Sequence, residues 1–165
     1  MPDIAEEDFN TLAGSLDYPM FVVTAAGDAG PAGCLVGFAT QCSIAPPRFM
    51  VWLSKNNRTY GVARDAPVLA VHVLDRDAAA LAELFGARTG HDTDKFAQCS
   101  WRPGPAGVPL LDEVAALFVG HVLERHDTGD HVGFLLRPTS VQLGHRGDGL
   151  LTFQDVRDLE PGHRA

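Results

Sequence analysis

The chain has 165 residues, of which 45% are hydrophobic and 21% are charged, and its formal net charge is −8. These proportions are typical of one globular domain, so we interpret residues 1–165 as a single domain. The acidic balance argues against nucleic acid or an anionic membrane as a partner, and no apolar run approaches the roughly 20 residues of a membrane span.

Two features of the chain favour a cytoplasmic location. The N-terminus reads MPDIAEEDF, whose acidic character is typical of neither a secretory signal nor a transit peptide. The three cysteines, Cys34, Cys42 and Cys99, are odd in number and form no CxxC pair. We therefore expect them to be reduced and mainly to serve packing.

The first predicted element is a helix at about residues 3–17. Asp3 is placed to cap it, and Glu6 three residues later completes a capping-box pattern. The helix is expected to end at Tyr18-Pro19, because the residue before a proline disfavours helical geometry. The apolar residues that fall roughly on one face are Ile4, Phe9, Leu12 and Leu16.

A barrel is predicted over about residues 20–153, and its second strand is unusual. A strand at residues 20–26 leads through the turn-rich GDAG into a long alternating strand at residues 32–44. Its even positions form a core-like face, whereas its odd positions are nearly bare apart from Leu35 and Gln41. A bare face lets either a planar ring or another element of the chain approach the backbone closely.

The remaining elements indicate a mostly β protein. Further strands are predicted at residues 48–54, 68–74, 115–125 and 131–143, with a short final strand at 149–153. A loop with one or two helical turns spans residues 55–67, a second helix spans 77–90, and a Gly/Pro-rich loop spans 103–109. About seven strands with two clear helices favour an all-β barrel or sandwich with helical decorations.

The loop after the strand at residues 48–54 is a candidate phosphate site. Asn57 or Thr59 can cap a short helix that Tyr60 begins, and Arg58 adds positive charge. Free N–H groups beside a cation suit a phosphate, although a solvated connecting loop has the same composition. Farther along, Arg88, His91 and Lys95 either belong to a solvated surface segment or provide a second anchor for an anion.

Histidines supply the other candidates for chemistry. Asp130 and His131 stand between two glycines at the start of a predicted strand, where they form either a reactive pair or a decorated hairpin turn. His72 lies within an apolar strand and is interpreted as a hydrogen-bonded structural histidine. No two histidines at i, i+2 or i, i+4 accompany an acid, so a dedicated metal site is not indicated.

Taken together, these segments resemble the flavin reductase-like family, whose fold is an FMN-binding split β-barrel. The resemblance runs from about residue 20 to residue 153 and depends on the order and spacing of the segments. Its most specific motifs are S-x-x-P-P at residues 43–47, Lys-Phe at 95–96 and Gly-Asp-His at 129–131.

The resemblance implies a split barrel with Greek-key-like connections, a few peripheral helices and a homodimeric assembly that binds flavin near the subunit interface. It implies NAD(P)H-dependent flavin reduction, in which NADH or NADPH passes a hydride to FMN or FAD. Many members pass the reduced flavin to a separate oxygenase. The chemistry belongs to the flavin, and the protein must stack the two rings about 3–3.5 Å apart.

The resemblance also assigns residues. Its flavin-contacting strand falls on Leu35, Val36, Gly37, Phe38, Ala39, Thr40, Gln41, Cys42 and Ser43. Its phosphate-side loop falls on Asn57, Arg58 and Thr59, and the residues that close over the site are Lys95 and Phe96. Members usually carry Thr or Ser at positions 35, 37 and 38, so backbone N–H groups are the expected flavin contacts here.

Asp130 and His131 match the family motif that faces the nicotinamide. Because successive side chains of an extended strand point to opposite sides, we expect these two residues not to pair. His131 is then the catalytic candidate that points into the pocket, and Asp130 secures the turn through backbone N–H groups. Both residues are assigned to the substrate side.

Two alternatives to a flavin reductase stay open. One is a flavin- or deazaflavin-binding oxidoreductase with another substrate. The other is a flavin-binding protein without catalytic activity.

Overall fold

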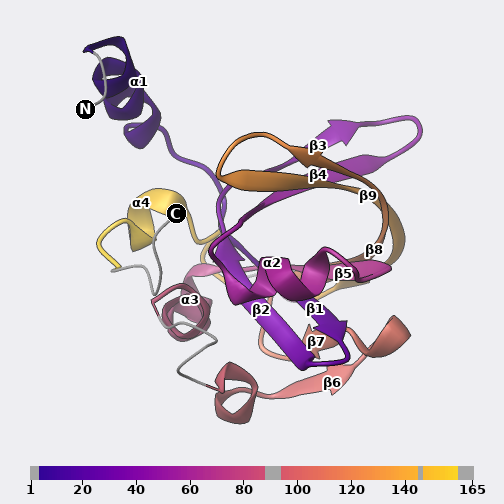
Figure 1. The fold of residues 1–165 in the computed structure, drawn as a ribbon. Coiled ribbons are helices and arrows are strands. Elements are labelled where there is room, and N and C mark those ends of the chain that lie inside the picture. Colours follow the sequence, from indigo (N-terminus) through magenta and orange to yellow (C-terminus); the bar gives the residue numbers. More distant parts are fainter. Residues whose placement is uncertain (1–3, 88–93, 145–146, 160–165) are drawn as a thin grey trace.

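The fold is built on one seven-stranded antiparallel sheet (Figure 1). In the computed structural model, the described residues are 4–87, 94–144 and 147–159. The strands lie in the order β2-β1-β5-β8-β9-β4-β3. Their bounds are β1 Phe21–Gly27, β2 Gly30–Val36, β3 Ala39–Ser43, β4 Arg48–Ser54, β5 Val68–Val73, β8 Ala116–Asp127 and β9 His131–Leu143.

The sheet curls into a barrel, and Figure 1 shows β3, β4 and β9 facing β1, β2 and β5 across its interior. β2 also contacts β4, although the two are not hydrogen-bonded neighbours in the sheet. The long strands β8 and β9 pair along nearly their whole length and provide the bend between the two sides. This is the predicted split barrel with peripheral helices.

Short helices and one small sheet surround the barrel. The helices are α1 Ile4–Gly14, α2 Arg58–Ala63, α3 Ala79–Gly86 and α4 Phe153–Val156. α2 packs on β1 and β2, and α3 packs on β2. The predicted Gly/Pro-rich loop is more ordered than expected, because β6 Trp101–Pro103 pairs with β7 Pro109–Leu111 around its tip. No helix among the described residues is long and apolar enough to cross a membrane.

The apolar side chains form two main clusters. The larger lies inside the barrel, and its largest fully buried members are Phe134, Leu53, Leu69 and Leu136. The second lies under α3, where Phe85 and Phe96 pack edge to face with ring centroids 5.5 Å apart. Burial of aromatic side chains in such pairs stabilises the fold beyond their buried area alone.

The predicted single strand at residues 32–44 is wrong, because the chain breaks at Gly37 and Phe38 into β2 and β3. β2 pairs with β1 at one edge of the sheet, and β3 pairs with β4 at the other. The alternation therefore does not mark one continuous core face. Cys34 is 3% exposed, but Phe38 is 54% exposed and Ile44 is 83% exposed.

Both predicted chain ends need correction. The final strand at residues 149–153 is reduced to two isolated bridges, Asp75 to Leu150 and Pro19 to Thr152, after which α4 begins. The N-terminal helix forms, but it ends at Gly14, before the predicted end at about residue 17, and it projects from the body of the molecule (Figure 1). Its predicted cap, Asp3, lies outside the described residues. The large apolar side chains of this segment, Ile4, Phe9, Leu12 and Leu16, are all more than half exposed.

His72 has the structural role that its position predicts. Its side chain is fully buried, Nδ1 lies 2.9 Å from the carbonyl oxygen of Val22, and Nε2 accepts a 3.0 Å hydrogen bond from the amide of Leu111. Because Nε2 accepts, Nδ1 carries the proton and donates to Val22. Burial lowers the pKa of His72 to about 4, so the ring is neutral at pH 7.

Candidate functional site

The candidate site is a pocket of about 350 Å³ at one end of the barrel. That volume is within the range of small-molecule sites. Its walls come from the N-terminal arm, the ends of β2 and β4, the start of β9 and the C-terminal segment. The lining residues are Tyr18, Met20, Cys34, Leu35, Val36, Gly37, Phe38, Trp52, Leu53, Ser54, Asn57, Gly86, His131, Phe153, Val156, Arg157 and Leu159.

The break between β2 and β3 shapes the floor of the pocket. The amide of Trp52 donates a 2.9 Å hydrogen bond to the carbonyl of Phe38, which holds the connecting turn against β4. The Phe38 ring then lies 5.1 Å from the His131 ring, at an interplanar angle of 50°. Leu35, Val36, Gly37 and Phe38 therefore line the pocket, whereas residues 39–43 are outside the lining.

The bare face of β2 is covered by this chain's own side chains. A Cβ atom on Gly33 would lie 2.9 Å from the Phe85 ring and 3.2 Å from the Phe96 ring. A Cβ on Gly37 would lie 2.5 Å from the Tyr18 ring. At Gly33 the structure shows close packing of another element of the chain, whereas Gly37 contacts Tyr18 and also lines the pocket.

The predicted phosphate loop contributes only partly to the pocket. Asn57 is the N-cap of α2, since its Oδ1 accepts a 2.9 Å hydrogen bond from the amide of Thr59. Arg58 points elsewhere, because Nη1 donates to the carbonyl of Pro31 at 2.9 Å and Nη2 to that of Ala29 at 3.4 Å. Thr59 is 1% exposed. Asn57 thus lines the pocket, and its two neighbours do not.

Lys95 and Phe96 lie inside the molecule and outside the lining of the pocket. Lys95 is 4% exposed, and its Nζ donates to the carbonyls of Gly33 at 3.3 Å and Phe85 at 3.2 Å. Burial lowers the pKa of Lys95 below its ordinary value. These contacts join the end of α3 to β2. The other two candidates of this segment, Arg88 and His91, lie outside the described residues.

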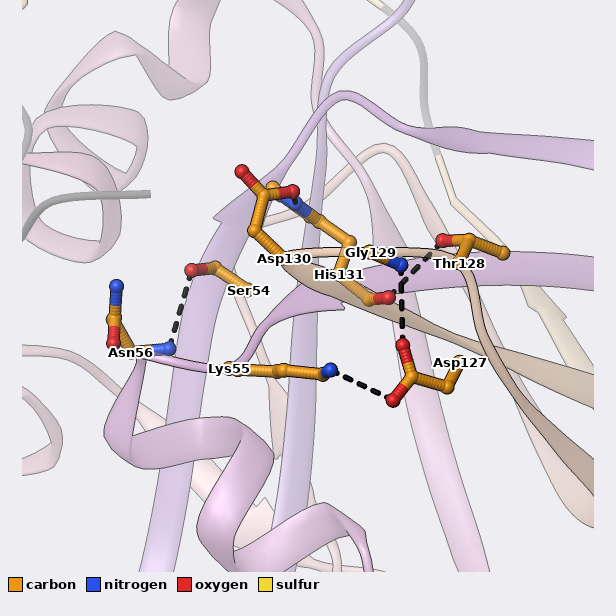
Figure 2. A network of polar contacts seen from close by, with 8 residues as sticks. All are labelled: Ser54, Lys55, Asn56, Asp127, Thr128, Gly129, Asp130 and His131. Atoms are coloured by element: carbon orange, nitrogen blue, oxygen red, sulfur yellow. Dashed lines mark hydrogen bonds and ion pairs between the residues drawn. The ribbon is translucent and has the colours of Figure 1, made fainter.

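His131 lines the pocket as predicted, but its relation to Asp130 differs from the prediction (Figure 2). Nδ1 of His131 donates a 2.7 Å hydrogen bond to Oδ1 of Asp130. The expectation that the two residues do not pair is therefore wrong. Asp130 lies in the turn before β9 begins, so the alternation of an extended strand does not govern its side chain. This hydrogen bond also holds the pKa of Asp130 below its ordinary value.

Asp127, and not Asp130, secures the turn through its side chain. Oδ1 of Asp127 accepts a hydrogen bond from the amide of Gly129 at 3.1 Å, and Oδ2 pairs with Nζ of Lys55 at 2.7 Å (Figure 2). Gly129 has a φ of 142°, a conformation that favours glycine. The Asp130 side chain therefore does not hold the turn, and its carboxylate accepts the hydrogen bond from His131.

The sequence analysis missed the C-terminal wall. Phe153 stacks on Tyr18 with ring centroids 5.0 Å apart, and its amide donates a 2.8 Å hydrogen bond to the Tyr18 carbonyl. Thr152 and Asp155 form a capping box that starts α4 at this point. That T-x-x-D pattern is a local signal for a helix start, but the contact between the two ends of the chain has no local signal.

The pocket combines apolar walls with few polar groups. Its described lining includes no Asp or Glu, although the chain carries a net charge of −8. Cys34 is not a nucleophile candidate, since burial raises the pKa of its thiol to about 11. Such a site suits a flat, apolar ring system that carries negative charge, with His131 and Arg157 as its basic side chains.

Comparison with protein families agrees with this geometry. The sequence profile of the flavin reductase like domain matches residues 13–160, which include the barrel and all the described lining residues of the pocket.

Curated relatives match over most of their length. The chain is 29% identical over 147 residues to the reductase component of 4-hydroxyphenylacetate 3-monooxygenase from Salmonella typhi, which covers 88% of this chain and 86% of that protein. It is 27% identical over 152 residues to the FMN reductase (NADH) RutF of Variovorax paradoxus, which covers 92% of this chain and 84% of that protein.

Solved structures share the fold. A flavin reductase domain protein from Arthrobacter superposes with a TM-score of 0.81 at 24% identity over 91% of each chain. A structure from Sinorhizobium meliloti superposes with a TM-score of 0.79 at 29% identity over 92% of this chain. The present chain spans 51% of that longer one.

Proposed function

Because the chain belongs to the flavin reductase-like family, we propose that it reduces a flavin in the described pocket with a hydride from NADH or NADPH. The observation that carries this proposal is that residues from three separate segments meet in one pocket. Leu35–Phe38, Asn57 and His131 come from three separate segments, were each assigned to the flavin or nicotinamide side, and line one pocket.

The volume of the pocket, about 350 Å³, and the chemistry of its lining support a flavin ring as its ligand. Tyr18, Phe38, Trp52 and Phe153 supply aromatic surface, and Ser54 and Asn57 supply polar atoms at one side. The flavin contributes the hydride chemistry, accepting at its ring the hydride that the nicotinamide gives up. This chain's residues bind and orient the two rings and exclude water, so no protein nucleophile is required.

His131 is the side chain that we assign to the nicotinamide side. Asp130 fixes the tautomer and direction of the imidazole by accepting from Nδ1 at 2.7 Å. Nε2 then has no hydrogen-bond partner among the residues that the structure describes, and we propose that it serves a polar group of the bound nucleotide. The other predicted flavin contacts lie outside the lining of the pocket: Ala39, Thr40, Gln41, Cys42, Ser43, Arg58, Thr59, Lys95 and Phe96.

The names of the relatives support the choice of substrates and partner. One is an FMN reductase that uses NADH, and another is the reductase component of a monooxygenase. We propose FMN or FAD as the flavin, NADH or NADPH as the reductant, and a separate oxygenase as a recipient of the reduced flavin. A cytoplasmic location is proposed because all three cysteines are free, as a reducing compartment keeps them.

We also propose a homodimer. Apolar side chains are exposed on α1 and at the β3–β4 and β8–β9 ends, with exposed fractions of 64% for Phe9, 83% for Ile44 and 83% for Leu143. A chain with a net charge of −8 associates more readily through such surfaces than through charge.

Steady-state assays test the proposed activity. Purified protein mixed with NADH or NADPH and excess FMN, FAD or riboflavin should oxidise the nicotinamide far faster than the flavin does alone. If the protein is a flavin reductase, at least one pair of a nicotinamide nucleotide and a flavin must be turned over. Flavin binding without turnover of any of these flavins would favour the alternative of a flavin-binding protein without catalytic activity. A deazaflavin is added as a further substrate, and turnover with it alone would favour the alternative of a deazaflavin-binding oxidoreductase.

A further inference from the structure

The C-terminal wall of the pocket contains a guanidinium that the family resemblance did not assign. Arg157 follows α4 directly and lines the pocket beside Phe153, Val156 and Leu159. Nη1 of Arg157 donates a 2.8 Å hydrogen bond to Oε1 of Gln154. This acceptor is a neutral amide, so the contact orients the guanidinium without neutralising it, and no carboxylate among the described residues forms an ion pair with Arg157.

This wall is held in place by contacts to the N-terminal arm. The amide of Gln154 donates to Oδ1 of Asp17 at 3.0 Å, and its side chain donates to the carbonyl of Leu16 at 3.0 Å. The ring of Phe153 stacks on that of Tyr18. The residue that orients Arg157 is therefore itself fixed, and the guanidinium is presented from an ordered wall of the pocket.

Two other cations that the sequence indicated for an anion, Arg58 and Lys95, lie among the described residues and are engaged elsewhere. Arg58 donates to the carbonyls of Pro31 and Ala29, and Lys95 donates to those of Gly33 and Phe85. Neither lines the pocket. Within the described lining, which contains no carboxylate, Arg157 is the one side chain that carries a full positive charge independent of pH.

We propose that Arg157 binds a phosphate group of the nucleotide that enters the pocket, either that of the flavin or one of the nicotinamide nucleotide. The planar guanidinium offers paired N–H donors that match two phosphate oxygens. This inference rests on the proposed function, since it takes flavin and nicotinamide nucleotides as the ligands.

Binding titrations without turnover test the assignment. The probes are two matched pairs: FMN against riboflavin, and NADH against 1-benzyl-1,4-dihydronicotinamide, the second member of each pair having no phosphate. Each ligand is titrated alone against wild type, Arg157→Gln, Arg157→Lys and the control Arg64→Gln. Arg64 is an exposed arginine that pairs with Asp65 and lies outside the lining.

Arg157→Gln should weaken the phosphate-bearing member of one pair by about tenfold and its phosphate-free partner by less than about twofold. The pair affected identifies the source of the phosphate. Arg157→Lys should recover part of the loss, and Arg64→Gln should match wild type. All variants should melt within a few degrees of wild type, because Arg157 is exposed.

The assignment would be overturned if Arg157→Gln changed the affinity for both members of each pair equally. It would also be overturned if Arg64→Gln lost as much affinity for the phosphate-bearing ligand as Arg157→Gln does. A wild-type protein that binds these ligands with the predicted selectivity but never oxidises NADH would contradict the proposed function and leave the phosphate site standing. Normal turnover of NADH, combined with an Arg157→Gln protein that loses the two members of each ligand pair equally, would contradict the phosphate site and leave the proposed function standing.

Discussion

At the scale of single residues, His131 and Asp130 form a unit whose two members should behave alike. His131→Ala should lower kcat/KM for the nicotinamide by about tenfold, because it removes a side chain from the pocket. Asp130→Asn should lower it in the same direction but less, because the amide oxygen can still accept a hydrogen bond from Nδ1 and hold the imidazole in place. Both variants should melt close to wild type, since the Asp130 side chain is 69% exposed.

Steady-state kinetics and thermal melting of the two variants separate this role from a structural one. A His131→Ala protein that melts several degrees lower and turns over at the wild-type rate would make the motif a hairpin decoration. Asp127→Ala is the matched control for the turn, because its carboxylate holds Gly129 and Lys55 and lies outside the lining of the pocket.

His72 should make the stability of the protein sensitive to mild acid. Its folded pKa of about 4 lies below the ordinary 6.5, so between these values the unfolded chain takes up a proton that the folded one does not. The free energy of unfolding should therefore fall as the pH falls from 6.5 to 4, by roughly 3 kcal/mol from this group.

Denaturant unfolding of wild type and His72→Gln across this pH range measures the effect. The variant should be less stable at pH 7, because glutamine replaces two buried hydrogen bonds imperfectly, and the gap should narrow towards pH 4. Parallel pH profiles for the two proteins would contradict the role of His72.

At the scale of elements, the packing of α3 on β2 decides what the glycines are for. Gly33→Ala should destabilise the protein by about 1–3 kcal/mol, because a Cβ there would meet the Phe85 and Phe96 rings at 2.9 and 3.2 Å. Gly61→Ala is the matched control in α2, where nothing lies within 4 Å, and it should stabilise by up to about 1 kcal/mol. Urea unfolding compares the two.

The opposite result for Gly33→Ala would indicate that the flavin binds on the glycine-bearing face of β2. If Gly33→Ala kept wild-type stability but lost flavin affinity, the face would be open to the ligand and not covered by α3 and the Phe96 segment.

Local patterns explain why most elements were predictable and why the strand at residues 32–44 was not. β8 and β9 follow from long apolar runs on either side of an Asp-Thr-Gly-Asp turn, and the Asn57 cap follows from its position before α2. The exchange of partners at Gly37 and Phe38 is a long-range event, set by pairing with β1 on one side and β4 on the other. An alternating pattern continues across such a break and gives no sign of it.

The residues of the candidate site also divide into those with a local sequence signal and those placed by contacts that are distant in the sequence. The motifs singled out Leu35, Asn57 and His131, and the structure places all three in the lining of one pocket, while their contact with a flavin or nicotinamide stays a prediction. Arg58 was misjudged as a free cation, because its carbonyl partners, Ala29 and Pro31, lie far away in the sequence. The wall that contains Phe153 and Arg157 depends on contacts between the two ends of the chain, so the local pattern did not indicate it.

At the scale of the whole molecule, the projecting helix should be a site of association. α1 extends from the body with Phe9 64% and Leu12 60% exposed, an arrangement that a second copy of the chain would cover. Light scattering at micromolar concentration should give about twice the 17.7 kDa of one chain. Phe9→Ser combined with Leu12→Ser should shift the mass towards the monomer. A wild-type protein of monomer mass would contradict the proposed homodimer.

The central claim is that the flavin acts in the pocket beside β4, and the fluorescence of Trp52 tests it most directly. The chain has two tryptophans, of which Trp52 lines this pocket and Trp101 lies in β6, outside its lining. In Trp101→Phe, titration with FMN should quench Trp52 strongly and saturably, with a midpoint near the KM for FMN in turnover. Turnover that saturates with FMN while Trp52 fluorescence stays unchanged would place the flavin elsewhere and contradict the account.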